Sequence, residues 1–537
     1  MDSAYPVGAE SASAQPKRAF PEGLLPHSSA TINALLSNVA RSYPAKEALV
    51  VDGARFTFAE IDRRAAQLAE ALHRRGIGRG AVIGTLLTDG IAMVELLIAA
   101  AKLSATILAL NWRSSAAEIA FIERDAEPNL CFVSEKFHEL AATMSPKCGV
   151  ISVKNDSAAG AWEALSLTPE SASFTQHDNA APGDRWYMLY TSGTTGRPKG
   201  CQHSQGAYYC NILAMSAALE IRPDDRFLLT SPLFHVGGLS NFLARFVSGA
   251  ATIVPRVGLS VKEVLQLVSE ESVTAMVLPY LDAEAFIEAQ RSDPQPLHLR
   301  TVMAGAGQRD KELLTAVRDV LNTDLKLGYG QSEIGGFASF ISYDDQVRRP
   351  TSCGRPILGL EARIADTAGA DVPIGATGEL LLRGPAIMMG YLNLPDETDA
   401  AIGSGWLKTG DLFSRDAEGF LYFAGRIKEL VKSGGENVYP LEVEKVLLKH
   451  ADIRDACIVG VPDQRWGEAV KAFVVLAHGK ALKPADVADW CRGHIAGYKR
   501  PRYVEFVLSI PRNAQGKPER AQLSARAVEP SQATDPT

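Results

Sequence analysis

Apolar and polar positions alternate along most of the chain between helical stretches and short β-branched or aromatic runs. From Ile32 to Val431, helix-like segments lead repeatedly into runs such as RWYMLY (185–190) and DLKLGYG (324–330). The runs TAMVLP (274–279) and RTVMAGA (300–306) are further junctions of this kind. This alternation is typical of an α/β fold with largely parallel sheets, in which ligands bind beyond the carboxyl ends of the strands.

The pattern changes twice toward the C-terminus. Around residues 360–425 the chain consists of short strand-like runs with frequent glycines, which favours an antiparallel, barrel-like subdomain. After the segment 425–437 a helix is predicted from about Pro440, because LEVEKVLLKH carries apolar residues at helical spacing. A small α+β unit follows, and we expect the domain boundary at Arg426–Lys428.

These patterns predict the organisation of the whole chain. We expect a large α/β N-terminal domain over residues 21–426, made of α/β subdomains and the small β-barrel-like subdomain. A small α+β C-terminal domain is expected over residues 427–525. Residues 1–20 and 526–537 have the Ser, Ala and Pro content of disordered tails.

Composition narrows the classes of function. The 537 residues are 46% hydrophobic, which is enough to fill more than one core. The formal net charge of −7 gives no basic stripe, which argues against nucleic acid and anionic membrane surfaces as partners. The most apolar stretch, IAMVELLIAAAKLSATILAL, is interrupted by Glu95 and Lys102, so it predicts a buried helix leading into a strand and not a membrane span.

The cysteines and the first residues indicate a compartment. The seven cysteines are scattered and include no CxxC pair, which favours free thiols in a reducing compartment over disulfides or a zinc site. The first residues lack the apolar core of a secretion signal. We therefore expect a cytoplasmic protein, and the sequence leaves monomer and homodimer both open.

The stretch YTSGTTGRPKG (Tyr190–Gly200) places hydroxyls, glycines and one lysine directly after a predicted strand. Glycines let backbone N–H groups approach a ligand, hydroxyls add donors, and the lysine adds a positive charge, a combination that suits phosphate. The residues that carry this prediction are Thr191, Ser192, Gly193, Thr194, Thr195, Gly196 and Lys199. Lys199 is followed by Gly200 and not by Ser or Thr, so the order is not that of a Walker loop, and a P-loop kinase or GTPase is disfavoured. A flexible surface loop has the same composition, and the later motifs favour phosphate binding over it.

Further motifs follow this stretch in order along the chain. They are FHVGG (234–238), YGQSE (329–333), GELLLRGPAIMMGY (378–391), TGD (409–411), GRIKELVKSGGENVYP (425–440), GVPDQRWGE (460–468) and NAQGKPER (513–520). Together with the opening stretch they resemble the signatures of the adenylate-forming superfamily, which contains acyl-CoA synthetases, peptide-synthetase adenylation domains and luciferases. The resemblance covers nearly the whole chain apart from the two tails. It implies an N-terminal domain that binds ATP and the acyl group, and a mobile C-terminal domain that takes part in catalysis.

Activation of a carboxylic acid brings two anions together, so cations and positioning are expected to carry most of the catalysis. By resemblance, Lys517 would reach from the small domain to the carboxylate and the α-phosphate. Glu333 is a hard oxygen ligand suited to holding Mg²⁺ against the nucleotide phosphates. The expected cofactors are therefore ATP, Mg²⁺ and coenzyme A.

The resemblance also implies contacts with the rest of the nucleotide. Tyr329 offers a flat face for adenine, and Asp411 would accept hydrogen bonds from the ribose hydroxyls, with Arg426 on the same sugar. Ser332 stands where the family usually has threonine, so it keeps the hydroxyl and loses the methyl group. The segment MAGAG (303–307) takes the place of the family's adenine-side loop but departs from its wording. The remaining residues expected at the nucleotide are Gly305, Ala306, Gly328 and Gly330.

A second set of residues is expected at the thiol acceptor. Ser433, Gly434 and Gly435 resemble the edge over which the pantetheine arm of CoA enters once the small domain has rotated. Glycines there would let a thiol chain pass close to the backbone. Lys428 stands at the family's hinge position, which implies that Lys517 and Gly434 face one active site in different half-reactions.

The sequence narrows the class of the carboxylic acid without naming one acid. His235 stands where peptide-synthetase adenylation domains usually carry an aspartate that holds an amino group, so amino acids are disfavoured and a simple aryl, alicyclic or aliphatic acid is favoured. His235 either gates the acyl channel or is a packed loop histidine. The residues expected to line the acyl pocket are His235, Gly238, Asn241, Ala304, Gly305 and Gly335.

The leading hypothesis is an acid–CoA ligase that forms an acyl-adenylate from ATP and transfers the acyl group to CoA. One alternative loads the phosphopantetheine of an acyl-carrier protein, or runs only one of the two half-reactions. An alternative of another class is a luciferase-like oxygenase, which would consume O₂ from the adenylate. A binding protein without catalysis is disfavoured because Lys199, Glu333, Asp411 and Lys517 are all present.

Overall fold

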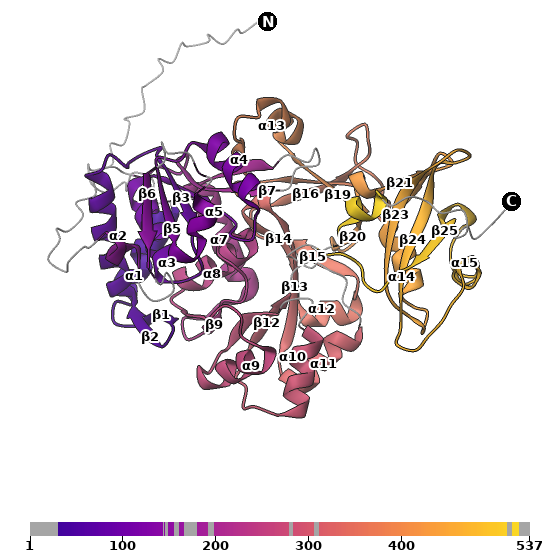
Figure 1. Cartoon of the computed structure of the whole chain (residues 1–537), viewed down its shortest axis with the longest axis horizontal. Helices are drawn as coiled ribbons and strands as arrows, with labels where there is room; N and C mark the ends of the chain where they lie inside the picture. The colour runs from indigo at the N-terminus through magenta and orange to yellow at the C-terminus, as the bar shows by residue number, and fades with distance from the viewer. Residues whose placement is uncertain are drawn as a thin grey trace, which may run out of the picture.

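The computed structural model describes residues 30–142, 144, 149–154, 160–165, 180–191, 198–278, 283–304, 311–512 and 518–525. Figure 1 shows a large α/β domain and, at the right of the view, a small C-terminal domain. This is the fold class that the sequence predicts.

The largest sheet joins a parallel half to an antiparallel half. Within the described part of the chain it has thirteen strands in the order β16-β17-β19-β20-β15-β14-β13-β12-β11-β9-β10-β1-β2. The strands of the parallel half are β1 (Glu47–Val51), β9 (Arg226–Leu228), β10 (Ala251–Val254), β11 (Ala275–Val277), β12 (Thr301–Ala304) and β13 (Asp324–Gln331), with β2 (Ala54–Thr57) antiparallel at the edge. The antiparallel half contains β14 (Gly336–Ile341), β15 (Ser352–Pro356), β16 (Glu361–Ala365), β17 (Gly378–Arg383), β19 (Leu407–Arg415) and β20 (Leu421–Arg426). The predicted glycine-rich antiparallel subdomain is therefore present, and its strands continue this sheet.

The second sheet carries the strand that precedes the glycine stretch. Among the described residues it has seven strands in the order β18-β8-β7-β4-β3-β5-β6. Their bounds are β3 (Val82–Leu86), β4 (Thr106–Ala109), β5 (Leu130–Ser134), β6 (Gly149–Val153), β7 (Arg185–Thr191), β8 (Lys199–Ser204) and β18 (Gly390–Tyr391). The strands from β7 to β6 are parallel, and β8 and β18 add to the edge in antiparallel fashion.

Helices cover and separate the sheets. The longer helices of the large domain are α1 (Ile32–Ser42), α2 (Phe58–His73), α3 (Ile91–Leu103), α4 (Ala116–Ala126), α7 (Gln205–Leu219), α8 (Val236–Val247), α9 (Val261–Glu270), α10 (Ala283–Ser292), α11 (Lys311–Leu321), α12 (Tyr343–Arg348) and α13 (Pro395–Ile402). Shorter helices are η1 (Glu135–Phe137), α5 (His138–Ala141), α6 (Ala161–Ala164) and η3 (Ser332–Ile334). Local sequence sets several starts, since α2, α4 and α9 each begin at a capping box with Glu60, Glu118 or Glu263 at the third position.

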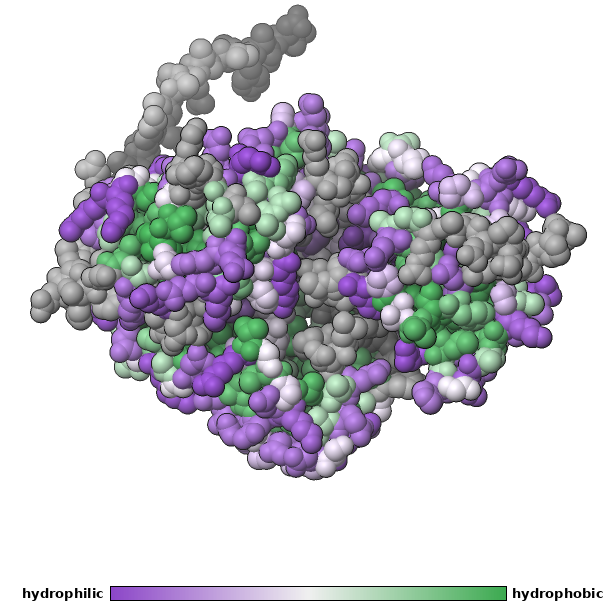
Figure 2. Space-filling model, viewed as in Figure 1, coloured by the Kyte–Doolittle hydropathy of each residue, from purple (hydrophilic) through white to green (hydrophobic). Residues whose placement is uncertain are grey.

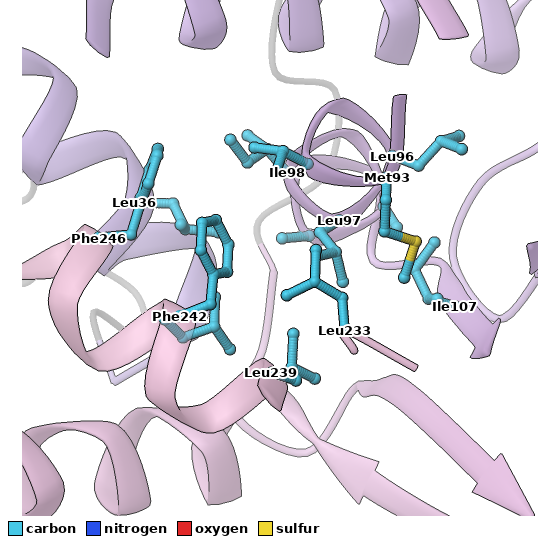
Figure 3. Packing of buried hydrophobic residues seen from close by; sticks show 14 of the residues in the cluster. Leu36, Met93, Leu96, Leu97, Ile98, Ile107, Leu233, Leu239, Phe242 and Phe246 are labelled. Atoms are coloured by element: carbon cyan, nitrogen blue, oxygen red, sulfur yellow. The ribbon is translucent and has the colours of Figure 1, made fainter. Parts of the chain in front are cut away.

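The core of the large domain is centred on α3. Every residue of this helix is buried, which confirms the predicted buried helix that leads into a strand, here β4. Figure 3 shows Leu97 and Ile98 of α3 near Leu36 of α1 and near Phe242 of α8. The main cluster of apolar residues therefore joins segments that lie far apart in the sequence.

The small domain has its own sheet and its own cores. Its strands are β21 (Val431–Ser433), β22 (Glu436–Val438), β23 (Ile453–Asp463), β24 (Gly467–Leu476) and β25 (Tyr503–Phe506). Its helices are α14 (Pro440–Leu447), α15 (Pro484–Arg492), η5 (Gly497–Lys499) and α16 (Arg520–Ser524), and η4 (Ile427–Glu429) precedes them. Helix α14 begins at Pro440, as predicted, and two apolar clusters contain only residues from Val431 onward.

The hydropathy of the surface and the state of the cysteines can be compared with what the composition predicts. Figure 2 shows a face on which hydrophilic residues are widespread and hydrophobic ones are interspersed. In the part of the chain that the structure describes, no helix has the length and apolar content needed to cross a bilayer. The described cysteines, which exclude Cys148, form no disulfide with one another.

The two charges that interrupt α3 are paired with α2. Glu95 is fully buried, and its Oε1 lies 2.5 Å from Nε of Arg64, which is 8% exposed. Lys102 Nζ lies 2.7 Å from Oδ1 of Asp62. The helix can therefore be buried on all sides, because each charge has a partner of opposite sign.

We expect replacement of Glu95 by leucine to destabilise the large domain by about 2 kcal/mol, because the buried Arg64 guanidinium then loses this carboxylate and keeps the more exposed Glu163 carboxylate, at 2.6 Å, as a partner. The double variant Arg64→Met with Glu95→Leu should lose less, since no buried charge is left unpaired. Urea unfolding checks this, with Glu70→Gln at the exposed Arg74–Glu70 pair as the control, expected within about 0.5 kcal/mol of the parent protein. A Glu95→Leu variant as stable as this control would contradict the expectation.

Candidate active site

The glycine stretch connects two adjacent antiparallel strands. β7 ends at Thr191, β8 begins at Lys199, and these two residues lie directly opposite each other. We call this pair of strands the β7–β8 hairpin. Residues 192–197, which contain the predicted contacts Ser192, Gly193, Thr194, Thr195 and Gly196, lie outside the described residues. The predicted strand before the stretch is confirmed.

The base of the β7–β8 hairpin is fixed by Tyr190. Its hydroxyl donates to Oδ2 of Asp125 in α4 at 2.5 Å. A Cβ at Gly200 would lie only 2.9 Å from Cζ of the Tyr190 ring. Close packing with this ring therefore explains the glycine at position 200 without a ligand.

Tyr391 connects the two charged groups that the sequence places at the triphosphate. The Lys199 ammonium lies 5.1 Å from the centroid of the Tyr391 ring. The Tyr391 hydroxyl donates to Oε1 of Glu333 at 2.9 Å. Burial and the neighbouring Glu333 carboxylate raise the pKa of Tyr391, so its hydroxyl stays protonated and remains a donor. Tyr391 belongs to the motif 378–391, but nothing in the sequence singled it out, because its partner lies 58 positions away.

Glu333 is the candidate metal ligand. It lies on η3, directly after β13, with its side chain partly exposed. Within the described residues, no group of three His, Cys, Asp or Glu side chains could hold a metal ion. Mg²⁺ usually binds with one or two carboxylates plus substrate phosphates, so the lone Glu333 carboxylate fits an ion shared with a nucleotide.

A second cluster surrounds Asp411. This carboxylate is 4% exposed and accepts a hydrogen bond at 2.8 Å from the Tyr329 hydroxyl. Arg426, its direct neighbour on β20, places Nε 3.2 Å from the other carboxylate oxygen. The structure therefore brings together three of the predicted nucleotide contacts.

The side chain of Tyr329 is packed within the protein. Its side chain is buried, and its ring meets Phe413 edge-on with centroids 4.8 Å apart. Burial raises the pKa of the Tyr329 hydroxyl, and the neighbouring Asp411 carboxylate raises it further. The hydroxyl therefore stays protonated as a donor to Asp411, and the contact of the ring with adenine stays a prediction.

Gly328 and Gly330 are explained by the turn of β13 into β14. A Cβ at Gly328 would lie 2.5 Å from the ring of Phe337, and one at Gly330 would lie 2.1 Å from the carbonyl oxygen of Gly336. These approaches exclude any larger side chain. The two glycines shape the strand that presents Ser332 and Glu333.

The backbone of Ser332 is held by a hydrogen bond from His203. Nε2 of His203 lies 2.6 Å from the Ser332 carbonyl oxygen, so Nε2 carries the proton because a carbonyl can only accept. His203 is fully buried, and in the described structure its Nδ1 has no hydrogen-bond partner. Burial lowers the pKa of His203 to about 4.

This shift makes the stability of the large domain depend on pH. The unfolded chain binds a proton at His203 near pH 6.5 while the folded chain does not, so stability is expected to fall as pH drops from about 6.5 toward 4. At pH 4.5 the loss relative to pH 7 should be about 2 kcal/mol larger in the parent protein than in His203→Gln, which keeps a donor for Ser332 and cannot titrate. Urea unfolding at both pH values measures the difference, and equal losses in the two proteins would contradict the assignment.

The residues predicted to line the acyl pocket gather around α8, and several have local structural roles. His235 caps α8, with its Nδ1 accepting from the Gly237 amide at 3.1 Å. A Cβ at Gly238 would lie 2.1 Å from the Pro232 carbonyl oxygen, so this glycine lets α8 pack on that loop. Asn241 is buried, donating to the Gly237 carbonyl at 2.9 Å and accepting from Arg245.

The remaining pocket residues that the structure describes lie at the ends of β12 and η3. Ala304 is buried at the end of β12, and Gly335 ends η3 with φ of +69°. Gly305 and Ala306 lie outside the described residues. Of the six residues predicted to line the acyl pocket, the structure describes all but Gly305, and their role in binding the acyl group stays a prediction.

The predicted CoA edge is a tight turn between β21 and β22. Ser433 pairs with Glu436, and the two residues between them, Gly434 and Gly435, have φ of +61° and +85°. Ser433 is buried, and the Gly434 amide donates to the Trp466 carbonyl at 2.9 Å. A Cβ at Gly434 would lie 2.7 Å from the Trp466 ring, whereas one at Gly435 would meet nothing within 4 Å.

The described residues that flank the segment of Lys517 have contacts within the small domain. Lys517 itself lies outside the described residues, while Arg512 and Pro518 form a bridge around residues 513–517. Arg520 binds Glu444 at 2.5 Å and Glu429 at 3.1 Å.

The predicted hinge residue is exposed. Lys428 lies on the short η4 helix next to Glu429. Its exposure agrees with a linker position and leaves a hinge role open.

Two family signatures match most of the chain. The AMP-binding enzyme family matches residues 36–392, and the AMP-binding enzyme C-terminal domain matches residues 442–517. An indoleacetate–CoA ligase of Aromatoleum aromaticum is 34% identical over 481 residues, which cover 88% of this chain and 94% of the relative. A 2-succinylbenzoate–CoA ligase of Bacillus cereus is 32% identical over 484 residues, covering 89% and 95%.

Solved structures show the same similarity over nearly the full length. The o-succinylbenzoate CoA synthetase of Bacillus subtilis in complex with its acyl-adenylate intermediate has a TM-score of 0.80 and 30% identity, and the match covers 92% of this chain and 99% of that one. A structure of the same enzyme with ATP and magnesium ion has a TM-score of 0.78 and 29% identity, covering 91% and 98%. The chain belongs to the AMP-binding enzyme family.

Proposed function

We propose that this chain is an AMP-forming acid–CoA ligase. The observation that carries the proposal is the arrangement of Lys199, Tyr391 and Glu333 beside the β7–β8 hairpin, in a chain that is similar along its length to CoA ligases. The Lys199 ammonium and the Glu333 carboxylate, which is suited to Mg²⁺, both contact Tyr391. Lys199 itself lies near the end of the glycine stretch. This arrangement suits the triphosphate of ATP.

The proposed reaction has two steps. A carboxylate oxygen of the acid attacks the α-phosphorus of ATP, the bond from that phosphorus to the bridging oxygen breaks, and pyrophosphate leaves. The thiolate of CoA then attacks the acyl carbonyl carbon, the bond to the AMP oxygen breaks, and AMP leaves. Capture by a thiol explains why an energy-rich mixed anhydride is formed at all.

The chain's own residues are proposed to neutralise the charge of the phosphates and to orient the substrates. Lys199 and the backbone of residues 191–196 bind the phosphates, and Asp411 with Arg426 holds the ribose. Mg²⁺, when bound by Glu333, would neutralise charge on the phosphate oxygens. Lys517 is proposed to join the carboxylate to the α-phosphate in the first step.

The two steps are proposed to use different positions of the small domain. We place the boundary at Arg426–Lys428, with the N-terminal domain over residues 21–426 and the mobile catalytic domain over 427–525. The separate apolar clusters that begin at Val431 support a domain able to move as a unit. Lys428 would then serve as the hinge.

The substrate class is proposed from what the site offers. His235 takes the place of a carboxylate that would hold an α-ammonium, so we propose a simple aryl, alicyclic or aliphatic acid and not an amino acid. His235 with Gly238, Asn241, Ala304, Gly305 and Gly335 is proposed to line the acyl pocket. The relatives that act on indoleacetate and 2-succinylbenzoate make those acids reasonable members of a test panel.

The test is ATP- and CoA-dependent release of AMP across a panel of carboxylic acids, with acyl-CoA measured in the same samples by mass spectrometry. At least one acid should give AMP and acyl-CoA in equal amounts, and omission of CoA should stop turnover after the adenylate. If no acid yields either product, the proposal fails.

A carrier protein is a second candidate acceptor. A fatty acid–[acyl-carrier-protein] ligase of Streptomyces coeruleorubidus is 30% identical over 495 residues, covering 91% of this chain and 94% of the relative. CoA and phosphopantetheine-loaded carrier protein would be compared at equal concentrations with the best acid. A faster reaction with the carrier would favour this second function.

A further inference from the structure

Glu333 is held at two points by the segment 388–391. The Met388 amide donates to the Glu333 carbonyl oxygen at 2.8 Å, and the Tyr391 hydroxyl donates to the Glu333 carboxylate at 2.9 Å. One contact fixes the backbone of η3, and the other orients the side chain. A flexible carboxylate would lose rotational freedom on binding an ion, and this arrangement removes part of that loss in advance.

Tyr391 is itself fixed by its neighbours. It pairs with Cys201 of β8, and its amide donates to Oγ1 of Thr398 at 2.9 Å. The preceding Gly390 has φ of +140°, and a Cβ there would lie 2.6 Å from the Thr398 side chain. The backbone of Tyr391 is thus held on both sides, and the hydrogen bond from its hydroxyl to Glu333 holds its ring between β8 and η3.

The face of the same ring lies under the Lys199 ammonium at 5.1 Å, within the range of a cation–π contact. The two groups that Tyr391 touches differ in charge and in their proposed task. The ring sets the position of the phosphate-binding cation, while the hydroxyl sets the position of the metal-binding carboxylate.

We infer that Tyr391 is a positioning residue that couples the metal ligand Glu333 to the phosphate-binding Lys199. The inference rests on the proposed function, because it needs a nucleotide and Mg²⁺ at this site. It assigns to one tyrosine the relative placement of the two groups, with no direct contact to the reacting atoms.

The test measures binding of ATP by calorimetry over a series of Mg²⁺ concentrations, without any acid or CoA. Tyr391→Phe removes only the hydroxyl, so it should need about tenfold more Mg²⁺ for half-maximal ATP affinity, the effect of one hydrogen bond to a charged group. With Mg²⁺ chelated, its ATP affinity should equal that of the parent protein. Tyr391→Leu also removes the ring, so it should bind ATP more weakly even with Mg²⁺ chelated.

A matched control is Tyr422→Phe, since the Tyr422 hydroxyl donates to the Asp416 carboxylate at 2.8 Å, away from this cluster. It should leave the Mg²⁺ requirement unchanged. The combination of Tyr391→Phe with Glu333→Gln should need no more Mg²⁺ than Glu333→Gln alone, because the hydroxyl acts through Glu333. The double variant also distinguishes a positioning role of Tyr391 from a general loss of stability. A general loss of stability would raise the Mg²⁺ requirement of the double variant above that of Glu333→Gln alone.

The outcomes are distinguishable from failure of the proposed function. If the parent protein binds ATP and Tyr391→Phe has an unchanged Mg²⁺ requirement, the inference is overturned while the proposed function stands. If the parent protein binds no ATP at any Mg²⁺ concentration, both are overturned.

Discussion

Replacement of Lys517 by alanine is expected to slow acyl-adenylate formation by about 10²- to 10³-fold, the usual effect of removing one group that stabilises charge in a transition state. Thioester formation from a supplied acyl-adenylate should be nearly unchanged, because the proposed role of Lys517 belongs to the first step only. The described residues on either side of this segment are held by the Arg512–Pro518 bridge and by the ion pair of Arg520 with Glu444.

The two steps are measured separately, the first by pyrophosphate release in a single turnover and the second by acyl-CoA formation from synthetic adenylate. Lys480→Ala is the matched control, an exposed lysine of the small domain that pairs with Asp452 at 2.9 Å. It should affect neither step. Equal loss of both steps in Lys517→Ala would count against the proposed alternation of domains.

A leucine at Gly434 is expected to have the opposite effect. Thioester formation should slow by about 10²-fold, the cost of misplacing a reacting group by about 1 Å, while adenylate formation stays within a few-fold of the parent rate. The physical reason is local, because the new side chain collides with the Trp466 ring and the backbone has φ of +61°. Both effects distort the turn over which the thiol arm is proposed to enter.

Gly435→Ala separates the collision from the strain of the turn. Its backbone also has a positive φ, but a Cβ there would meet nothing within 4 Å. It should therefore lose much less of the second step than the leucine at Gly434. Equal losses would assign the effect to turn strain, and an equal loss of adenylation in the leucine variant would contradict a role confined to the thiol.

Local patterns in the sequence were enough to predict the elements that position the site. The strands that end near Thr191 and at Ala304 follow from short β-branched and aromatic runs. The helix that begins at Pro440 follows from helical spacing of apolar residues. Each of these features depends mainly on neighbours along the chain.

Contacts between distant segments could not be predicted in this way. Tyr391 reaches Glu333 only because the short strand β18 adds to the edge of β8, and no local pattern specifies that pairing. The hydrogen bond from the Tyr329 hydroxyl to Asp411 likewise joins two residues that lie 82 positions apart. Both contacts depend on the arrangement of strands that lie far apart in the sequence.

Glycines show the same limit most clearly. Gly200 ends the stretch predicted to bind phosphate, and Gly238 is among the residues predicted to line the acyl pocket. In the structure the first packs under the Tyr190 ring and the second on the Pro232 carbonyl. A glycine signals a close approach, but only the folded structure identifies the neighbour.

The most direct test of the account follows oxygen atoms. The best acid of the panel, labelled with ¹⁸O in its carboxylate, would be turned over with ATP and CoA, and the AMP analysed by mass spectrometry. Attack of the carboxylate on the α-phosphorus predicts that each AMP gains one ¹⁸O. Unlabelled AMP, or label found in inorganic phosphate together with ADP, would contradict activation through an acyl-adenylate.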